Sequence, residues 1–262
     1  MNYNYHTHTF RCNHATELEE EYISVAIKNG IKFLGFSDHI PVRYIDGFNS
    51  RYRVPVNLAD DYISTIKNLR EKYKNEIEIS IGFEMEYYPQ MFEQMLNDAI
   101  NWGAEYLILG EHFCSPEYDP INKNTVRYEV TPSAEEKDVK TYFETLTQGI
   151  KTGKFTYVCH PDICNFIGDD EIYDKHARPF IKSCKKYNIP LEINFLGIRT
   201  NRAYPTNKFW KIVGEEGAPV TFGLDSHSAI DAFDAPSLIK AKEMIKEFNL
   251  NYIGKPKLIP LK

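Results

Sequence analysis

The chain has 262 residues, which is enough for one large α/β domain or for two smaller ones. Its composition, 42% hydrophobic and 26% charged residues, is typical of a globular protein in water. The formal net charge is −6 and there is no long apolar run, so the sequence gives no reason to expect nucleic acid or a membrane as a partner. An anionic substrate would need a local group of cations in such an acidic protein.

Short apolar runs alternate with helical patterns along the whole chain. The apolar runs lack strict alternation, as expected of strands that are buried on both faces. They predict seven strands, near residues 4–6, 32–37, 77–83, 106–109, 156–159, 191–194 and 220–223.

Helical signals fill the gaps between these strands. Residues 16–19 read Thr-Glu-Leu-Glu, a capping box that predicts a helix from Thr16 to about Asn29. An apolar stripe at helical spacing, from Tyr62 to Tyr73, predicts the next helix, and Pro236 is placed to begin the last one. The irregular stretches 41–57 and 113–132 are interpreted as loops over the functional face.

Repeated β-then-α order indicates a parallel sheet with right-handed crossovers. Seven such units predict a single domain over residues 1–262, a TIM-like (β/α)7 barrel one unit short of the usual eight. A flat, doubly wound sheet is the alternative.

The five cysteines are odd in number and contain no C-x-x-C pair. This usage is typical of free thiols in a reducing compartment, and the chain begins without a basic and apolar leader, so we expect a cytoplasmic protein. Cys12, Cys114 and Cys159 lie close to histidines, which leaves thiolate ligation open as a less favoured alternative. The sequence predicts no particular oligomeric state.

Seven of the eight histidines follow a predicted strand or lie just beyond one: His6, His8, His14, His39, His112, His160 and His227. Because the carboxyl ends of parallel strands meet at one edge, these imidazoles should share one site. Glu84 and Asp225 end two further strands and would add carboxylates. Nitrogen and carboxylate ligands indicate a multinuclear site for Zn, Fe or Mn, with Asp38 and Asp162 as possible partners that orient imidazoles.

Arginines are the natural phosphate ligands, because a guanidinium can form two parallel hydrogen bonds to an oxyanion. Arg199 and Arg202 follow the sixth strand and are the favoured candidates. Arginines in the two long loops are weaker candidates: Arg43, Arg51, Arg53 and Arg127.

These residues resemble the motifs of the PHP (polymerase and histidinol phosphatase) family, in the family's order and over nearly the whole chain. The matching pieces are His6-Thr7-His8, His14, Phe36-Ser37-Asp38-His39, Gly82-Phe83-Glu84, His112, His160-Pro161-Asp162 and Asp225-Ser226-His227. Within the family, the opening HTHTF, the run at 82–89 and Glu192-Ile193-Asn194 are most similar to stand-alone histidinol-phosphate phosphatases.

The resemblance implies a distorted seven-stranded barrel of PHP type that holds three divalent metal ions. The implied ligand sets are His6, His8, Glu84 and Asp225 for the first ion, Glu84, His112 and His160 for the second, and His14, His39 and His227 for the third. The implied activity is hydrolysis of a small phosphate ester, histidinol phosphate of histidine biosynthesis, by metal-activated hydroxide. Arg199 would stabilise the phosphoryl oxygens, and Asp162 or His227 would assist the leaving alkoxide.

Three other functions stay open at this point. The same core could cleave phosphotyrosine, a sugar phosphate or a nucleotide. An amidohydrolase-type enzyme also begins with H-x-H but typically bridges its metals with a modified lysine, and no lysine ends the third or fourth strand here. A non-catalytic metal-binding module would bind metal without turning over any ester.

Overall fold

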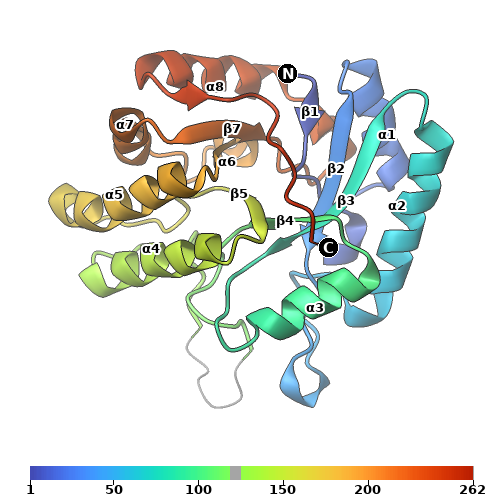
Figure 1. Ribbon diagram of the computed structural model, residues 1–262, viewed down its shortest axis with the longest axis horizontal. Helices are drawn as coiled ribbons and strands as arrows, with labels where there is room; N and C mark the ends of the chain where they lie inside the picture. The colour runs from blue at the N-terminus through green and yellow to red at the C-terminus, as the bar shows by residue number, and fades with distance from the viewer. Residues whose placement is uncertain (119–124, 262) are drawn as a thin grey trace.

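The computed structural model describes residues 1–118 and 125–261, and the part of the predicted 113–132 loop at 119–124 lies outside the described residues. Its centre is an all-parallel sheet whose eight strands follow one another in chain order (Figure 1). The strands are β1 (Tyr3–Asn4), β2 (Phe33–His39), β3 (Glu78–Met85), β4 (Tyr106–Leu109), β5 (Phe155–Val158), β6 (Leu191–Asn194), β7 (Pro219–Gly223) and β8 (Asn251–Tyr252).

All seven predicted strands are confirmed, but the predicted count of seven is wrong, because β8 adds an eighth strand. This two-residue strand pairs with the start of β7, Pro219 with Asn251 and Val220 with Tyr252. Its polar, partly exposed residues show no apolar run and therefore carry no strand signal. The sheet is a curled half-barrel of eight strands rather than a closed (β/α)7 barrel.

The chain segments that follow β1 and β7 meet beyond the carboxyl ends of these strands. Beyond β1, Thr7 forms a parallel bridge to Ser226, which follows β7. The amide of His8 donates to the Ser226 carbonyl at 3.0 Å, and the amide of Ser226 donates to the His6 carbonyl at 3.3 Å. These bonds bring the residues after the first and seventh strands side by side.

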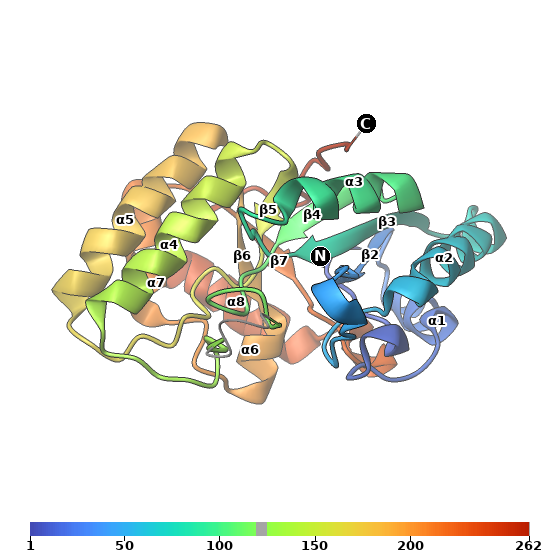
Figure 2. The ribbon, with the colours of Figure 1, turned by 90° about the horizontal axis from the view of Figure 1, so that it is seen from below.

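Helices surround the curled sheet, as two views at right angles show (Figures 1 and 2). Helices α4, α5 and α7 cover one flank, and α1 and α2 cover the opposite one. The helices are α1 (Glu19–Lys28), α2 (Ala59–Tyr73), α3 (Phe92–Trp102), α4 (Glu136–Lys151), α5 (Asp170–Tyr187), α6 (Phe195–Thr200), α7 (Asn207–Glu216) and α8 (Ala235–Glu247). In the described part of the chain, none is both long and apolar enough to cross a membrane.

The first helix begins later than the capping box predicts. Its first residue is Glu19, and its N-terminal amide at Leu18 is capped by the side chain of Glu21 at 3.3 Å. Thr16 instead donates its hydroxyl to Glu17, whose backbone is left-handed with φ of 56°. The chain therefore turns at Glu17 before the helix can start.

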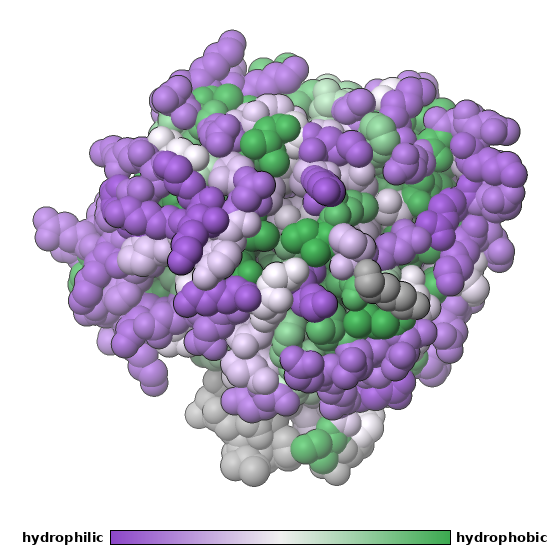
Figure 3. All heavy atoms as spheres, in the orientation of Figure 1, coloured by the Kyte–Doolittle hydropathy of each residue, from purple (hydrophilic) through white to green (hydrophobic). Residues whose placement is uncertain are grey.

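Buried aromatic rings fill the inside of the sheet. The hydroxyl of Tyr106 donates to the Tyr5 carbonyl at 2.9 Å, and a Cβ on Gly35 would lie only 2.2 Å from that hydroxyl oxygen. The C-terminal segment crosses in front of the strands in Figure 1, and the amide of Ile259 donates to the Thr156 hydroxyl at 3.1 Å. Hydrophilic side chains cover the outer helices on this face, and apolar groups gather near its centre (Figure 3).

Candidate metal centre

A cavity of about 270 Å³ opens at the carboxyl ends of the strands. Six of the seven strand-end histidines line it, and the seventh, His6, lies directly beneath with no exposed surface. The stretches 41–57 and 113–132 supply further walls through Tyr52, Arg53, Phe113 and Arg127. This agrees with their interpretation as loops over the functional face.

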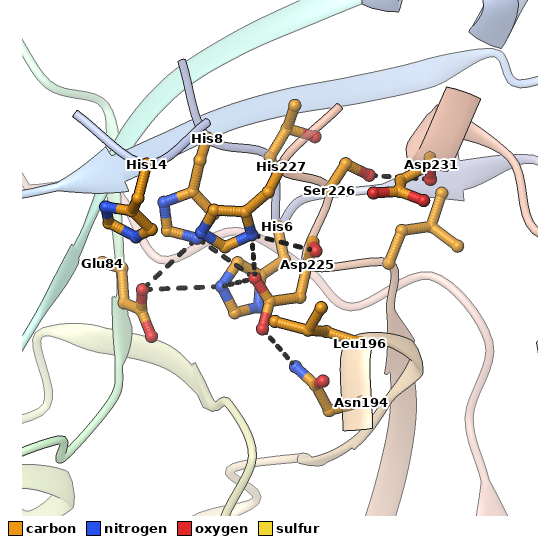
Figure 4. Close-up of polar contacts among 12 residues, drawn as sticks. His6, His8, His14, Glu84, Asn194, Leu196, Asp225, Ser226, His227 and Asp231 are labelled. Carbon is orange, nitrogen blue, oxygen red and sulfur yellow. Dashed lines mark hydrogen bonds and ion pairs between the residues drawn. The ribbon is translucent and has the colours of Figure 1, made fainter. Parts of the chain in front are cut away.

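Four buried ligand atoms converge at the bottom of this cavity (Figure 4). The Nε2 atoms of His6 and His8 lie 3.6 and 3.5 Å from Oε2 of Glu84, and 3.6 and 3.3 Å from Oδ1 of Asp225. None of these four atoms has a hydrogen-bond partner among the described residues. Buried polar atoms in proteins are nearly always paired, so four together need an explanation.

A metal ion explains the spacing of the four atoms. Ligands placed tetrahedrally at about 2.1 Å from an ion lie roughly 3.4 Å from one another, close to the four observed separations. The backbone of Asp225 is left-handed, with φ of 47°, which is uncommon for a residue other than glycine and is typical of strained functional positions. The residues present therefore fit a bound divalent ion.

The other carboxylate oxygen of Glu84 faces a second group of ligands. Its Oε1 lies 2.7 Å from Nε2 of His160 and 3.4 Å from Nε2 of His112. The thiol of Cys159 also donates to this oxygen at 3.1 Å. Glu84 thus presents one oxygen to each of two ligand groups, which is the geometry of a bridging carboxylate.

A third group contains imidazoles only. Ring nitrogens of His14, His39 and His227 all lie within 4.8 Å of one another. His39 is buried, His227 is partly buried and His14 is exposed, so this group lies toward the opening of the cavity. The structure therefore brings all nine sequence-predicted ligands into one cluster of three groups.

Charge within the cluster favours ionised carboxylates. Burial opposes ionisation of Glu84, but the imidazoles of His112 and His39 hold its pKa well below the usual range. Burial likewise opposes the charged form of His6, but the carboxylates of Glu192 and Asp225 raise its pKa to about 10. Burial lowers the pKa of His14 to about 4. A bound divalent cation would replace the imidazole protons as the positive charge between these carboxylates, and would remove the repulsion between neighbouring imidazolium groups.

Three buried carboxylates orient the imidazoles from behind. Glu192 accepts from Nδ1 of His6 at 3.0 Å, and Glu86 accepts from Nδ1 of His112, also at 3.0 Å. Asp38, which the sequence predicts for this task, lies 3.4 Å from Nδ1 of His8. These contacts direct each Nε2 toward the ligand groups.

Glu86 and Glu192 were not assigned this role from the sequence. For Glu86, the signal in the sequence is spacing: it lies two residues after Glu84, and alternate residues of a strand point to the same side. Glu192 lies within β6, where a Cβ on the neighbouring Gly223 would come within 1.9 Å of its Oε2. A glycine opposite a buried carboxylate leaves the room that the carboxylate needs.

Asp162 lies apart from the cavity that it was predicted to serve. Its Oδ2 accepts from the amide of Thr206 at 2.5 Å, next to the start of α7. Burial raises the pKa of Asp162 to about 7. Among the described residues, Asp162 is not one of those that line the cavity, so its carboxyl holds a loop rather than facing a ligand.

Of the six candidate arginines, three line the cavity, namely Arg53, Arg127 and Arg202, and three do not, namely Arg43, Arg51 and Arg199. Arg127 and Arg202 line the cavity, and both bind Glu129, through Nη2 at 2.8 Å and Nη1 at 2.5 Å respectively. Arg199 instead donates to the carbonyls of Leu224 and Asp225, and it does not line the cavity. Its guanidinium also pairs with an aspartate, Asp231, at 3.2 Å.

Arg43 and Arg53 differ sharply although both belong to the 41–57 loop. Arg43 is half exposed and pairs with Asp98 outside the cavity. Arg53 is buried and lines the cavity, with Nη1 2.7 Å from Glu86 and Nε 2.8 Å from Glu117. Arg53 therefore ties its loop to the carboxylate that orients His112.

A curled parallel α/β sheet with imidazoles and carboxylates gathered at its carboxyl edge defines a metallohydrolase-like centre. The PHP domain model matches residues 4–195 of this chain. The protein belongs to the PHP family.

Curated relatives agree with this membership, and solved structures share the fold. The probable histidinol-phosphatase of Deinococcus radiodurans is 25% identical over 240 residues, which cover 85% of each chain. The structure of HisK from Listeria monocytogenes superposes with a TM-score of 0.72 at 21% identity, covering 90% of this chain and 99% of that one. The histidinol phosphate phosphatase of Lactococcus lactis, solved with Zn, L-histidinol and phosphate, gives a TM-score of 0.68 at 19% identity over 96% and 95% of the two chains.

Proposed function

We propose that the protein is a metal-dependent phosphomonoester hydrolase whose substrate is histidinol phosphate. The observation that carries the metal dependence is the group of four unpaired ligand atoms on His6, His8, Glu84 and Asp225. Family membership and the names of the relatives support phosphate-ester hydrolysis and the substrate.

The residues would hold three divalent ions, Zn, Fe or Mn. His6, His8, Glu84 and Asp225 form the first site, and Glu84 with His112 and His160 forms the second. His14, His39 and His227 form the third. All these ligands lie near or beyond the carboxyl ends of strands of one continuous sheet, which supports a single domain over residues 1–262.

Divalent ions held by these ligands would lower the pKa of a bound water, so that hydroxide would be available at neutral pH. Arg127 and Arg202 bind the phosphoryl oxygens, because their guanidinium groups line the cavity and Glu129 holds both in place. Of the two predicted proton donors for the leaving group, Asp162 lies outside the cavity. His227 lies inside but is assigned to the third ion, and an imidazole bound to metal has no proton on the ligating nitrogen.

The size and lining of the cavity favour a small ester. A volume of about 270 Å³ admits a compact molecule, and Tyr52, Phe113 and Tyr204 provide aromatic walls for its organic part. Five free cysteines are typical of a reducing compartment, so we place the reaction in the cytoplasm.

Phosphate release from a panel of esters tests this proposal. Protein loaded with Zn, Fe or Mn should hydrolyse histidinol phosphate with a higher kcat/KM than phosphotyrosine, a sugar phosphate or a nucleotide. A higher kcat/KM for one of the other esters would refute the substrate. Tightly bound metal without turnover of any ester would instead indicate a non-catalytic module.

A further inference from the structure

The segment that follows β7 carries ligands of two ion sites and has an unusual backbone. Asp225 belongs to the first site and His227 to the third. The backbone of Asp225 is left-handed, with φ of 47°, and its Oδ1 has no hydrogen-bond partner among the described residues. A residue other than glycine keeps such a conformation only where its surroundings hold it there. The contacts of this segment therefore decide where the carboxylate of Asp225 lies.

Helix α6 binds the backbone of this segment through the guanidinium of Arg199. Its Nη1 donates to the Leu224 carbonyl at 2.6 Å, and its Nη2 donates to the Asp225 carbonyl at 2.5 Å. These two carbonyls belong to the peptide groups on either side of the Asp225 Cα. Peptide groups are planar, so only φ and ψ of Asp225 set the orientation of one group relative to the other. Because the guanidinium is rigid and planar, binding both carbonyls fixes these two dihedrals.

The guanidinium of Arg199 is itself held in place. Arg199 lies in the last turn of α6, and its side chain is largely buried. Its Nε lies 3.2 Å from a carboxylate oxygen of Asp231, and its Nη1 lies 3.9 Å from one of Asp234. Two carboxylates thus face its positive charge, and Arg199 does not line the metal cavity. Arg199 therefore acts on the metal centre through the backbone of Asp225 and not by direct contact with a substrate.

The other end of α6 holds the carboxylate of the same aspartate (Figure 4). Asn194 caps the start of α6, where its Oδ1 accepts from the amide of Gly197 at 3.1 Å. Its Nδ2 donates to Oδ2 of Asp225 at 3.0 Å. This bond engages Oδ2 and leaves Oδ1 facing Nε2 of His6 and Nε2 of His8, at 3.6 and 3.3 Å. One short helix thus contacts Asp225 at both ends, at the side chain through Asn194 and at the backbone beyond its last turn.

We propose that Arg199 is a positioning residue that sets the carboxylate ligand of the first ion by fixing the backbone of Asp225. This inference rests on the metal dependence proposed above. Without the two guanidinium bonds, the left-handed backbone of Asp225 is free to relax, and Oδ1 moves away from the Nε2 atoms of His6 and His8. The first ion then loses one of its four ligands, whereas the second ion keeps its own.

A competition titration of metal-loaded Arg199→Ala with a chelator, with metal analysis after each step, tests this role. The affinity for the first ion should fall about 10- to 100-fold, as is typical when a group that orients a metal ligand is removed. Glu86→Gln identifies the second ion, because Glu86 orients His112 of that site. The ion weakened by Glu86→Gln should keep its wild-type affinity in Arg199→Ala.

Arg70→Ala is the matched control, because Arg70 also binds a backbone carbonyl and a carboxylate, those of Ile79 and Glu105, but at the amino end of β3. Its metal affinity should equal that of wild type, even where urea titration shows a lower free energy of unfolding.

Three results would overturn the inference: wild-type affinity for every ion in Arg199→Ala, a loss that falls on the second ion, or an equal loss in Arg70→Ala. Wild-type protein that binds no metal would refute the proposed function as well, so the two failures are distinguishable. If Arg199→Ala does not fold, Arg199→Lys decides the matter. A single ammonium nitrogen then replaces the two guanidinium nitrogens that bind the carbonyls, so wild-type affinity in this variant would overturn the inference.

Discussion

Replacing Glu192 with glutamine should weaken metal binding at the first site without removing a ligand. Glu192 is fully buried, and its two oxygens lie 3.1 and 3.0 Å from Nδ1 of His6. The carboxylate fixes the proton on Nδ1 and so leaves the Nε2 lone pair for an ion. Glutamine can still accept the hydrogen bond but loses the negative charge. Loss of such a partner typically costs about 10- to 100-fold in metal affinity, which is about 1.4 to 2.7 kcal/mol.

The assay is a competition titration with a chelator, read by metal analysis of the protein after each step. Glu86→Gln is the companion variant, because Glu86 orients His112 of the second site. Each variant should lower the affinity of a different ion.

Glu136→Gln is the control for both variants. Glu136 accepts from Nε2 of His176 at 2.9 Å. The variant therefore makes the same change to a carboxylate–imidazole pair, but on a partly exposed surface away from the cluster. Metal content should not change. Wild-type affinity in Glu192→Gln, or an equal loss in Glu136→Gln, would refute the role assigned to Glu192.

Four further changes test other parts of the site. Glu84→Ala should remove at least two ions and all activity, measured by metal analysis and phosphate release; activity at the wild-type level would contradict the bridging role. Arg202→Ala should raise KM about 10- to 100-fold, whereas Arg43→Ala should leave KM unchanged, since Arg202 lines the metal cavity and Arg43 does not. Arg199→Ala should lower the free energy of unfolding by about 1.5 to 3 kcal/mol in urea titrations, because it removes hydrogen bonds to two carbonyls. Gly223→Ala should displace Glu192 and reduce metal affinity in the chelator titration.

The strands and the ligand positions could be predicted because both follow from local pattern. Buried parallel strands appear as apolar runs, and their order in the sheet is their order in the chain. The residues just after such runs must then meet at one edge, which is why His160 and Asp225 lie in one cluster although 65 positions separate them in the printed sequence. The edge strand β8 could not be predicted in this way, because its two residues are stabilised by pairing with β7 rather than by burial.

The carboxylates behind the imidazoles are harder to predict than the ligands. Glu86 and Glu192 are as buried as Glu84, but burial of an acidic residue is a property of its neighbours and not of its own sequence. Their role depends on which imidazole nitrogen each one reaches. That depends on side-chain direction across neighbouring strands, which a single sequence does not specify.

The arginines show why the substrate side of the site resists prediction altogether. Arg199 and Arg202 are three positions apart and look equivalent in the sequence. Helix α6 ends at Thr200, and Asn201 adopts a left-handed backbone with φ of 53°. The chain reverses there, so Arg199 remains in the last helical turn and binds the backbone after β7, while Arg202 leaves the helix and reaches Glu129 at the cavity. A single backbone dihedral therefore separates a stabilising arginine from a candidate phosphate ligand, and neither residue type nor spacing records that difference.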